Sequence, residues 1–284
     1  MPEGDSIYRE AALLHGALAG RTLLASEFRV PAFAAVDVAG QTIERVHSRG
    51  KHLLIHLPQA VLHSHLKMEG TWHVYGLPAD GSRPHWRRPG HTARCVLTTA
   101  GHQAVGFSLG ELHVFSPAEA QKHLAHLGPD PLGDDWDAGE AWRRLLTQPD
   151  RAIGVALLDQ RNLAGVGNVY RSEICFLAGF HPEIPVRSVP DLERVLALAH
   201  RLLGINKLRP RRCTTGTPGG GTDLWVYGRG GKPCLRCRGR IERATSGEAA
   251  QRRAAQEDRV IYFCPRCQPP PGSPAAPQSP WVAR

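Results

Sequence analysis

Apolar residues near the amino terminus recur with the spacing of one helical face. Ile7, Ala11, Leu14 and Leu18 stand three or four positions apart, and Gly20 follows them as a stop signal. The pattern predicts an amphipathic helix. The start of this helix coincides with the beginning of the chain.

The period of the apolar residues changes to two between Thr42 and about Phe115. The alternation is clearest in residues 53–57 and 61–65, and turn-forming residues occupy positions 49–50 and 79–81. This pattern predicts a sheet-rich domain that is built from hairpins.

Helical spacing returns after residues 128–137, a stretch rich in proline, glycine and aspartate that predicts an interdomain linker. The predicted helices cover residues 141–147, 153–160, 169–177 and 192–203. The last is the best defined, because its apolar residues share one face, Ser188 and Pro190 precede it, and Gly204 follows it. The second domain is therefore predicted to be mainly helical.

The remaining segments are short or of low complexity. Residues 213–223 predict a flexible loop, residues 224–263 a small ribbon, and the proline-rich end a disordered tail. The resulting division is residues 1–128 for the sheet-rich domain, 129–139 for the linker, 140–223 for the helical domain, 224–268 for the ribbon and 269–284 for the tail.

The composition favours a folded protein that binds nucleic acid. The 284 residues are 42% hydrophobic, which is enough for a sizeable core, and the formal net charge is +9. Residues 201–267 hold 15 Lys and Arg against 5 Asp and Glu, and a field of this sign concentrates polyanions. A solvated basic surface is the alternative interpretation. Because the sequence shows neither a membrane-length apolar run nor a signal peptide, we expect a cytoplasmic, nucleoid-associated protein.

Four of the seven cysteines form two Cys-x-x-Cys pairs, Cys234 with Cys237 and Cys264 with Cys267. Each pair spans a tight turn that offers two thiolates to one tetrahedral ion, so the pairs predict a structural zinc site with no open coordination position. The long separation between the pairs predicts an extended hairpin, with residues 248–257 as the extension. A redox dithiol is the competing interpretation. The remaining cysteines are expected to be buried, inert thiols: Cys95, Cys175 and Cys213.

Two glycines join the second and third predicted helices, in the sequence Gly165-x-Gly167-Asn168. A turn of this kind aims successive backbone N–H groups at one point beside a helix N-terminus, which makes an anion site suited to a DNA phosphate. A plain connection between helices explains the same sequence equally well.

Four separate motifs now stand in order along the chain: Met1-Pro2-Glu3-Gly4, Arg49-Gly50-Lys51, Gly165-x-Gly167-Asn168 and the four-cysteine ribbon. Together they resemble the formamidopyrimidine-DNA glycosylase and endonuclease VIII family, over residues 1 to about 268. The resemblance implies an α+β multidomain fold, with an N-terminal β-sandwich flanked by helices, a C-terminal helical domain with a helix–two-turns–helix motif, and a four-cysteine zinc ribbon. It also implies a monomer that binds damaged DNA, duplex or single-stranded, with one structural zinc ion and no small-molecule cofactor.

The same resemblance implies a bifunctional DNA glycosylase and abasic-site lyase of base excision repair. Removal of Met1 would expose the secondary amine of Pro2 as the nucleophile. Alpha-amino groups titrate at about 7.7 to 8.0, so a useful fraction is unprotonated near neutral pH. Attack at the sugar C1′ would expel the base and leave an iminium, after which β- and δ-elimination would cut the strand.

The resemblance assigns roles to five further side chains. Glu3 would act as general acid, and Lys51 would contact a phosphate near the lesion and assist base loss. Asn168 and Arg259 match phosphate-binding residues of the family. Met68 is similar to a wedge methionine that fills the gap left by the flipped nucleotide. Simpler interpretations are a helix-dipole carboxylate, a solvated turn lysine and a core methionine for Glu3, Lys51 and Met68.

Two departures from the family pattern bear on specificity. Asp5 and Ser6 stand where members often carry Pro-Glu, so we expect a second N-terminal carboxylate to be displaced or missing. Residues 106–113 lack the Pro-Arg-Arg-Phe-Gly segment of the formamidopyrimidine branch. The missing segment, together with the short loop between the long predicted helix and the ribbon, points to the endonuclease VIII branch and to oxidised pyrimidines as the favoured bases.

Three alternatives stay open at this point. One is a DNA-binding family member with abasic-site lyase activity only, or with no base excision, for which the Asp5-Ser6 departure leaves room. A second is specificity for 8-oxoguanine and formamidopyrimidines. A third is a zinc-ribbon protein that binds RNA, which would show no preference for abasic DNA.

Overall fold

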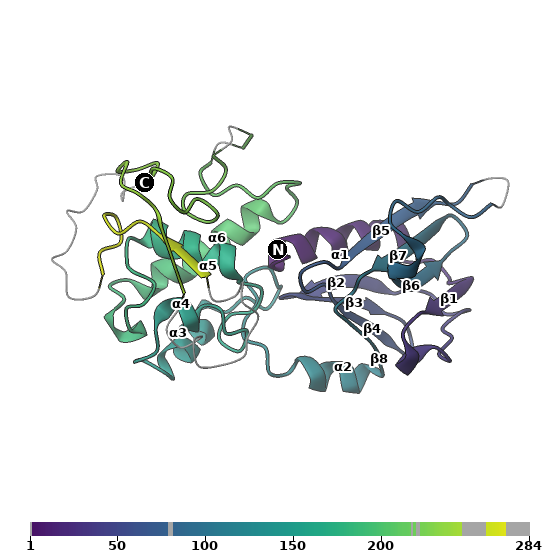
Figure 1. The fold of residues 1–284 in the computed structure, drawn as a ribbon. Helices are drawn as coiled ribbons and strands as arrows, with labels where there is room; N and C mark the ends of the chain where they lie inside the picture. Colours follow the sequence, from purple (N-terminus) through teal and green to yellow (C-terminus); the bar gives the residue numbers. More distant parts are fainter. Residues whose placement is uncertain (1, 79–81, 217, 220–221, 246–259, 271–284) are drawn as a thin grey trace. The chain divides into compact units, whose positions relative to one another are not determined.

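The structure is a computed structural model that describes residues 2–78, 82–216, 218–219, 222–245 and 260–270. The chain divides into two compact units (Figure 1), residues 1–127 and 128–284, here called the N-terminal and C-terminal domains. Within the described ranges, none of the helices has both the length and the apolar character needed to cross a membrane.

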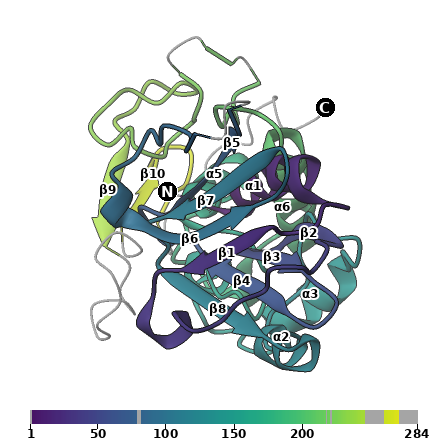
Figure 2. The same cartoon turned by 90° about the vertical axis from the view of Figure 1, so that its right-hand side faces the viewer.

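The N-terminal domain is a sandwich of two four-stranded antiparallel sheets, which Figure 2 shows as separate layers. The first sheet has the strand order β1 (Ala25–Phe28), β6 (Ala93–Thr98), β7 (His102–Phe107) and β5 (Thr71–Gly76). The second has the order β2 (Arg45–Arg49), β3 (His52–His56), β4 (Val61–His65) and β8 (Glu111–Phe115). The predicted β-sandwich is confirmed. Strand β1 lies outside the predicted stretch, because only one of its four residues is buried and the alternation is therefore weak.

Helix α1 (Gly4–Leu18) packs against β2 and β5, and the four apolar residues that predicted it are all buried. Helix α2 (Pro117–Leu124), which packs against β4 and β8, was not predicted. It buries a single residue, Ala120, so it has no apolar stripe to recognise. Its start does carry a capping box, in which Ser116 Oγ accepts from the Glu119 N–H. Two short 3-10 turns complete the domain: η1 (Pro31–Phe33) and η2 (Gly90–Thr92).

The C-terminal domain is mainly helical, as predicted. Its elements are α3 (Ala138–Leu146), α4 (Ile153–Ala156), α5 (Asn168–Ala178), η3 (Val186–Ser188), α6 (Leu192–Asn206), β9 (Glu242–Thr245) and β10 (Val260–Phe263). Strands β9 and β10 pair antiparallel. The core forms where α5 and α6 pack together, with α3 against α6. Residues 128–131, within the stretch of linker-like composition, are buried in this domain.

Three predicted helix boundaries were wrong, and the first is that of α3, which begins at Ala138 rather than Ala141. Helix α4 ends at Ala156 rather than near Gln160, because the Asn162 side chain donates to the Ala156 carbonyl (3.0 Å) and draws the chain into a turn. Helix α6 continues through Gly204 to Asn206. The Asn206 amide bonds to groups on both sides of the helix end, including the Cys213 N–H (2.7 Å), which offsets the cost of about 1 kcal/mol for a glycine inside a helix.

Candidate functional site

The two residues at the amino terminus are held by the start of α1. Pro2 is half-buried, and Glu3, the N-cap of the helix, has 0% of its surface exposed. The Glu3 N–H donates to Ser6 Oγ (2.9 Å), and Ser6 Oγ donates to the Glu3 carbonyl (3.0 Å). The positive end of the helix dipole favours a carboxylate at this place. The peptide that carries Pro2 is thus fixed. Ser6, which stands where the family pattern often has a glutamate, stabilises this turn.

Lys51 lies in a two-residue turn between β2 and β3. Arg49 pairs with His52, so Gly50 and Lys51 form the turn, and Gly50 has a φ of 56°. A left-handed residue at the first turn position is what a type II′ hairpin needs, and glycine supplies it without strain. The Arg49-Gly50-Lys51 motif therefore projects a half-buried lysine from the end of the second sheet.

A second cationic residue, Lys67, lies at the same end of this sheet. The register joins Arg49, His52, His65 and Glu111 across the four strands, so the turns after β2 and β4 emerge together. Burial, with the nearby charges of Lys67 and Lys51, lowers the pKa of His65 to about 4. Two lysines and a neutral imidazole thus gather at what we call the Lys51 end of the sandwich.

Helix α1 brings Pro2 and Glu3 toward the Lys51 end. His15 accepts from the Val46 N–H (3.1 Å) at the start of β2, whereas Glu10 accepts from the Trp72 N–H (3.0 Å), just past the turn that follows β4. From His15 back to Glu3 the helix rises about 18 Å. From Val46 to Lys51 strand β2 and its turn advance about 17 Å. The predicted nucleophile, acid and lysine therefore share one end of one domain.

Met68 lies in the turn that follows β4, and its residue surface is 46% exposed. Leu66 beside it is buried, and the Gly70 N–H donates to the Leu66 carbonyl (2.9 Å), which closes the turn. A Cβ on Gly70 would lie 2.5 Å from that same oxygen, so the turn requires glycine. The interpretation of Met68 as a core residue was therefore wrong.

In the C-terminal domain the predicted glycine turn leads directly into α5. The Gln160 side chain holds the turn, because it donates to the Val166 carbonyl (2.9 Å) and accepts from the Gly165 N–H (2.9 Å). Gly165 has a φ of 90°, and Gly167 is the N-cap of α5. The motif thus places a glycine turn directly before a helix N-terminus, whose dipole favours an anion.

Asn168 joins this turn to the ribbon. Its amide donates to the carbonyl of Val260, the first residue of β10 (2.8 Å). The guanidinium of Arg171, which is fully buried, donates to the Asn168 amide oxygen (3.1 Å) and to the same Val260 carbonyl (3.1 Å). Sequence reasoning missed Arg171, because a charged residue in a helix is normally solvated. Arg259, which precedes Val260, lies outside the described residues.

A buried carboxylate anchors the loop that follows α6. Glu173 accepts hydrogen bonds from the backbone N–H groups of Trp225 (2.8 Å), Val226 (2.9 Å) and Tyr227 (2.9 Å), and from the Thr214 hydroxyl. Burial raises the pKa of Glu173. Both ends of the loop that was predicted to be flexible are therefore attached to α5. No signal in the sequence indicates these contacts, which join residues more than forty positions apart.

The four ribbon cysteines bring their sulfur atoms within 4.8 Å of one another. The Cys234 and Cys267 sulfurs are 3.9 Å apart, and those of Cys237 and Cys264 are 3.4 Å apart. Sulfurs on a tetrahedral zinc ion, each about 2.3 Å from the metal, stand about 3.8 Å apart. The cluster has the donor set and the spacing to hold such an ion. The three other cysteines are buried, as expected, and the predicted hairpin extension at 248–257 lies outside the described residues.

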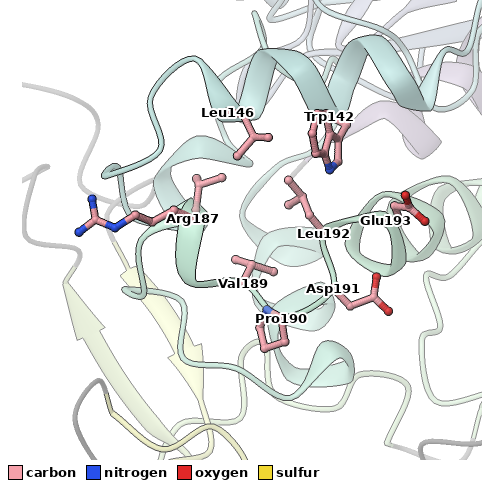
Figure 3. A pocket seen from close by; sticks show the side chains of 9 residues that line it. Trp142, Leu146, Arg187, Val189, Pro190, Asp191, Leu192 and Glu193 are labelled. Carbon is pink, nitrogen blue, oxygen red and sulfur yellow. The ribbon is translucent and has the colours of Figure 1, made fainter.

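A pocket of about 340 Å³ opens in the C-terminal domain (Figure 3). Its apolar wall includes Trp142 and Leu146 of α3, Val189, and Leu192 at the start of α6, with Arg187 and two carboxylates at the rim. It contains none of the predicted catalytic or DNA-binding side chains.

The family of the chain follows from its similarity to known proteins. The profiles of the formamidopyrimidine-DNA glycosylase N-terminal domain and H2TH domain match residues 1–108 and 127–205. A Streptomyces coelicolor protein named probable endonuclease 8 2 is 47% identical, over 95% of this chain and 95% of its own length. The chain belongs to the formamidopyrimidine-DNA glycosylase and endonuclease VIII family.

Other members of the family extend the comparison. A Mycolicibacterium smegmatis protein named DNA-(apurinic or apyrimidinic site) lyase Nei2 is 44% identical, over 94% of this chain and 99% of its own length. The Bacillus licheniformis formamidopyrimidine-DNA glycosylase is 30% identical, over 94% and 99%. The fold matches that of Lactococcus lactis formamidopyrimidine-DNA glycosylase bound to abasic-site DNA, with a TM-score of 0.75 at 23% identity, over 94% of this chain and 100% of that one. By class, the chain is a DNA-repair glycosylase and abasic-site lyase.

Proposed function

We propose that this family member removes oxidised bases, pyrimidines above all, and then cuts the strand through a Schiff base on the amine of Pro2. The observation that carries the proposal is the placement of Pro2 and Glu3 on α1 at the Lys51 end of the sandwich. A nucleophile, a proton donor and a cation then lie where one damaged nucleotide can meet all three.

The chemistry follows from a secondary amine at the chain terminus. After loss of Met1, the Pro2 nitrogen attacks C1′ of the damaged nucleotide, and the glycosidic bond breaks as the base leaves with its electron pair and takes up the proton that the nitrogen loses. Glu3 donates a proton to the deoxyribose ring oxygen, which opens the sugar and leaves a charged iminium. That charge acidifies the 2′ position, so a 2′ proton and the 3′ phosphate leave by β-elimination. Elimination of the 5′ phosphate follows.

Binding of DNA is assigned to cationic and amide groups in both domains. Lys51 is proposed to contact a phosphate beside the lesion, and the Gly165-x-Gly167-Asn168 turn another, through its backbone N–H groups and the Asn168 amide. Arg259, which directly precedes Val260 in the sequence, is proposed to grip a flanking phosphate. These contacts would act on chromosomal DNA in the cytoplasm, with the protein as a monomer.

Met68 is proposed to occupy the space that a flipped nucleotide leaves. Its exposure, in a turn that buried Leu66 and constrained Gly70 hold in place, supports this role. An apolar, unbranched side chain can enter a base stack and adapt to its shape.

The preference for oxidised pyrimidines rests on two supports. The more similar relatives are named endonuclease 8, whereas a formamidopyrimidine-DNA glycosylase is 30% identical. Residues 106–113 also lack the Pro-Arg-Arg-Phe-Gly segment of the formamidopyrimidine branch. Specificity for 8-oxoguanine and formamidopyrimidines is the alternative, and a panel of duplexes with thymine glycol, dihydrouracil, 8-oxoguanine or an abasic site distinguishes the two.

A zinc ion is proposed for the four-cysteine cluster. The cysteine donors and sulfur spacing fit it, and four thiolates leave no place for substrate. Its role would be to hold the ribbon strands against α5.

Borohydride trapping tests the proposed function. Untagged protein incubated with abasic duplex and borohydride should form a covalent complex, because reduction of the iminium makes the bond permanent. The matched control is the same chain with a short N-terminal extension, which should bind the duplex yet form no adduct. Lack of an adduct with the untagged protein, together with retained affinity for abasic DNA, would instead support a DNA-binding protein without this chemistry.

A further inference from the structure

Glu10 makes an unusual connection between two parts of the N-terminal domain. One carboxylate oxygen accepts from the Trp72 N–H (3.0 Å), and the other accepts from the Thr71 hydroxyl (3.4 Å). Glu10 lies on α1, seven residues after Glu3, whereas Thr71 and Trp72 begin β5 directly after the Met68 turn. One side chain therefore links the helix that carries the proposed nucleophile to the turn that carries the proposed wedge.

The surroundings of Glu10 disfavour the charged form of its carboxyl group. Glu10 is half-buried, and burial raises its pKa to about 7, against a usual value near 4.5. Arg9 on the same helix and the two hydrogen bonds oppose that shift without cancelling it. A glutamate used only for solubility would lie in water, where its pKa would be ordinary.

The Met68 turn is held on its other side as well. The Lys67 N–H donates to His65 Nδ1 (3.0 Å), and Lys67 Nζ forms an ion pair with Glu111 (2.6 Å). Trp72 is itself fixed, because its indole N–H donates to Ser64 Oγ (3.0 Å) inside the sandwich. With Glu10 bound to the Trp72 N–H, the turn is attached to α1 on one side, and to β4 and β8 on the other.

The geometry points to Glu10 as a positioning residue for base eversion, one that fixes the Met68 turn relative to the Pro2 end of α1. This inference rests on the proposed function. An apolar side chain that must enter a base stack at a set distance from the attacking nitrogen works only if its turn is rigid, since a displacement of about 1 Å in such a constellation is costly. Glu10 would touch no atom of the substrate.

The test compares two substrates that differ in their need for a wedge. Thymine glycol in a duplex must be everted, whereas an abasic site in single-stranded DNA has no base to expel and no partner strand to replace. Glu10→Leu removes both acceptors and keeps the volume of the side chain. It should slow excision from the duplex by about fivefold to tenfold, because the turn loses its hydrogen bonds to the helix, and leave borohydride trapping on the single strand unchanged.

Three further variants make the result specific. Glu10→Gln keeps an acceptor oxygen for the Trp72 N–H and should restore the rate on the duplex. Glu44→Leu removes an exposed carboxylate from the same domain and should leave both substrates unaffected. In a Met68→Ala background, Glu10→Leu should have no additional effect, because the two changes act through the same turn.

Equal slowing of both substrates by Glu10→Leu, or an unchanged rate on the duplex, would overturn the inference. If the leucine variant does not fold, Glu10→Asp draws the carboxylate back by one methylene and should give the same split between substrates. Failure of the proposed function looks different, because the unmodified protein would then form no adduct with either substrate. If Met68→Ala itself reacts normally with the duplex, the wedge assignment fails, and the role of Glu10 fails with it.

Discussion

At the scale of single residues, the side chains proposed to do chemistry are few, and a hydrogen bond or a tight turn holds three of them. The Glu3 peptide is fixed by Ser6, Lys51 by a glycine turn, and Asn168 by the Val260 carbonyl. Such support lowers the cost of organising the site when DNA arrives, because the groups are already near their working positions.

Arg171 gives a prediction at this scale. Arg171→Met would leave the Asn168 amide oxygen and the Val260 carbonyl short of a buried donor, at a cost of about 1 to 3 kcal/mol. The free energy of unfolding from urea titrations should fall by that amount, and affinity for abasic DNA should fall with it. Arg187→Met is the control, since it removes an exposed ion pair with Asp150, a kind of pair worth about 0 to 1 kcal/mol. Equal losses in the two variants would contradict the structural role of Arg171.

At the scale of elements, one face of the second sheet carries an unusual layer of histidines against α2. His52 Nδ1 lies 2.8 Å from His63 Nε2, and the His63 ring is 5.0 Å from the ring of His123 on the helix. The His113 ring stacks on Phe115 with a centroid separation of 5.1 Å. Burial and the neighbouring imidazoles lower the pKa of His52 to about 2, and that of His63 to about 3. The rings of His52 and His63 are therefore neutral at physiological pH and pack as flat, largely apolar groups.

Acid should loosen this face before it affects the carboxylates. The unfolded chain takes up protons on His52 and His63 below about pH 6.5, whereas the folded domain does not, so the stability present above pH 6.5 is lost as the pH falls. At pH 5 the loss is at most about 2 kcal/mol for each ring that stays neutral. Urea titrations between pH 7 and 5 should show this slope, and His63→Leu should reduce it. A pH slope that His63→Leu leaves unchanged would contradict the assignment.

At the scale of the whole molecule, the sequence predicts the features that depend on residues close together in the chain. The two cysteine pairs, the glycine turn, the period-two strands and the terminal Pro-Glu are each read within a few residues, and the sandwich, the helices and the cysteine cluster appear where they were expected. The missed features are long-range: Glu173 to Trp225 joins residues 52 positions apart, and Asn168 to Val260 joins residues 92 apart. Short helices without an apolar stripe, such as α2, were missed because their signal lies in a cap rather than in periodicity.

Metal content tests how the ribbon depends on its cysteines. We expect one zinc ion per chain by elemental analysis, and its removal by a chelator should lower affinity for abasic DNA by at least about tenfold, since metal binding and folding of such ribbons are coupled. Cys237→Ser should have the same effect. Cys95→Ser, in the core of the N-terminal domain, should keep the metal. A metal-free protein with full affinity for DNA would exclude this role.

The most direct test of the account is the identity of the atom that becomes joined to the sugar. The borohydride-trapped complex can be digested with nuclease and protease, and the modified peptide can be sequenced by mass spectrometry. The account predicts a chain that has lost Met1, with the deoxyribose remnant on the nitrogen of Pro2. A remnant on Lys51 or another lysine, or Met1 still attached in active protein, would contradict it.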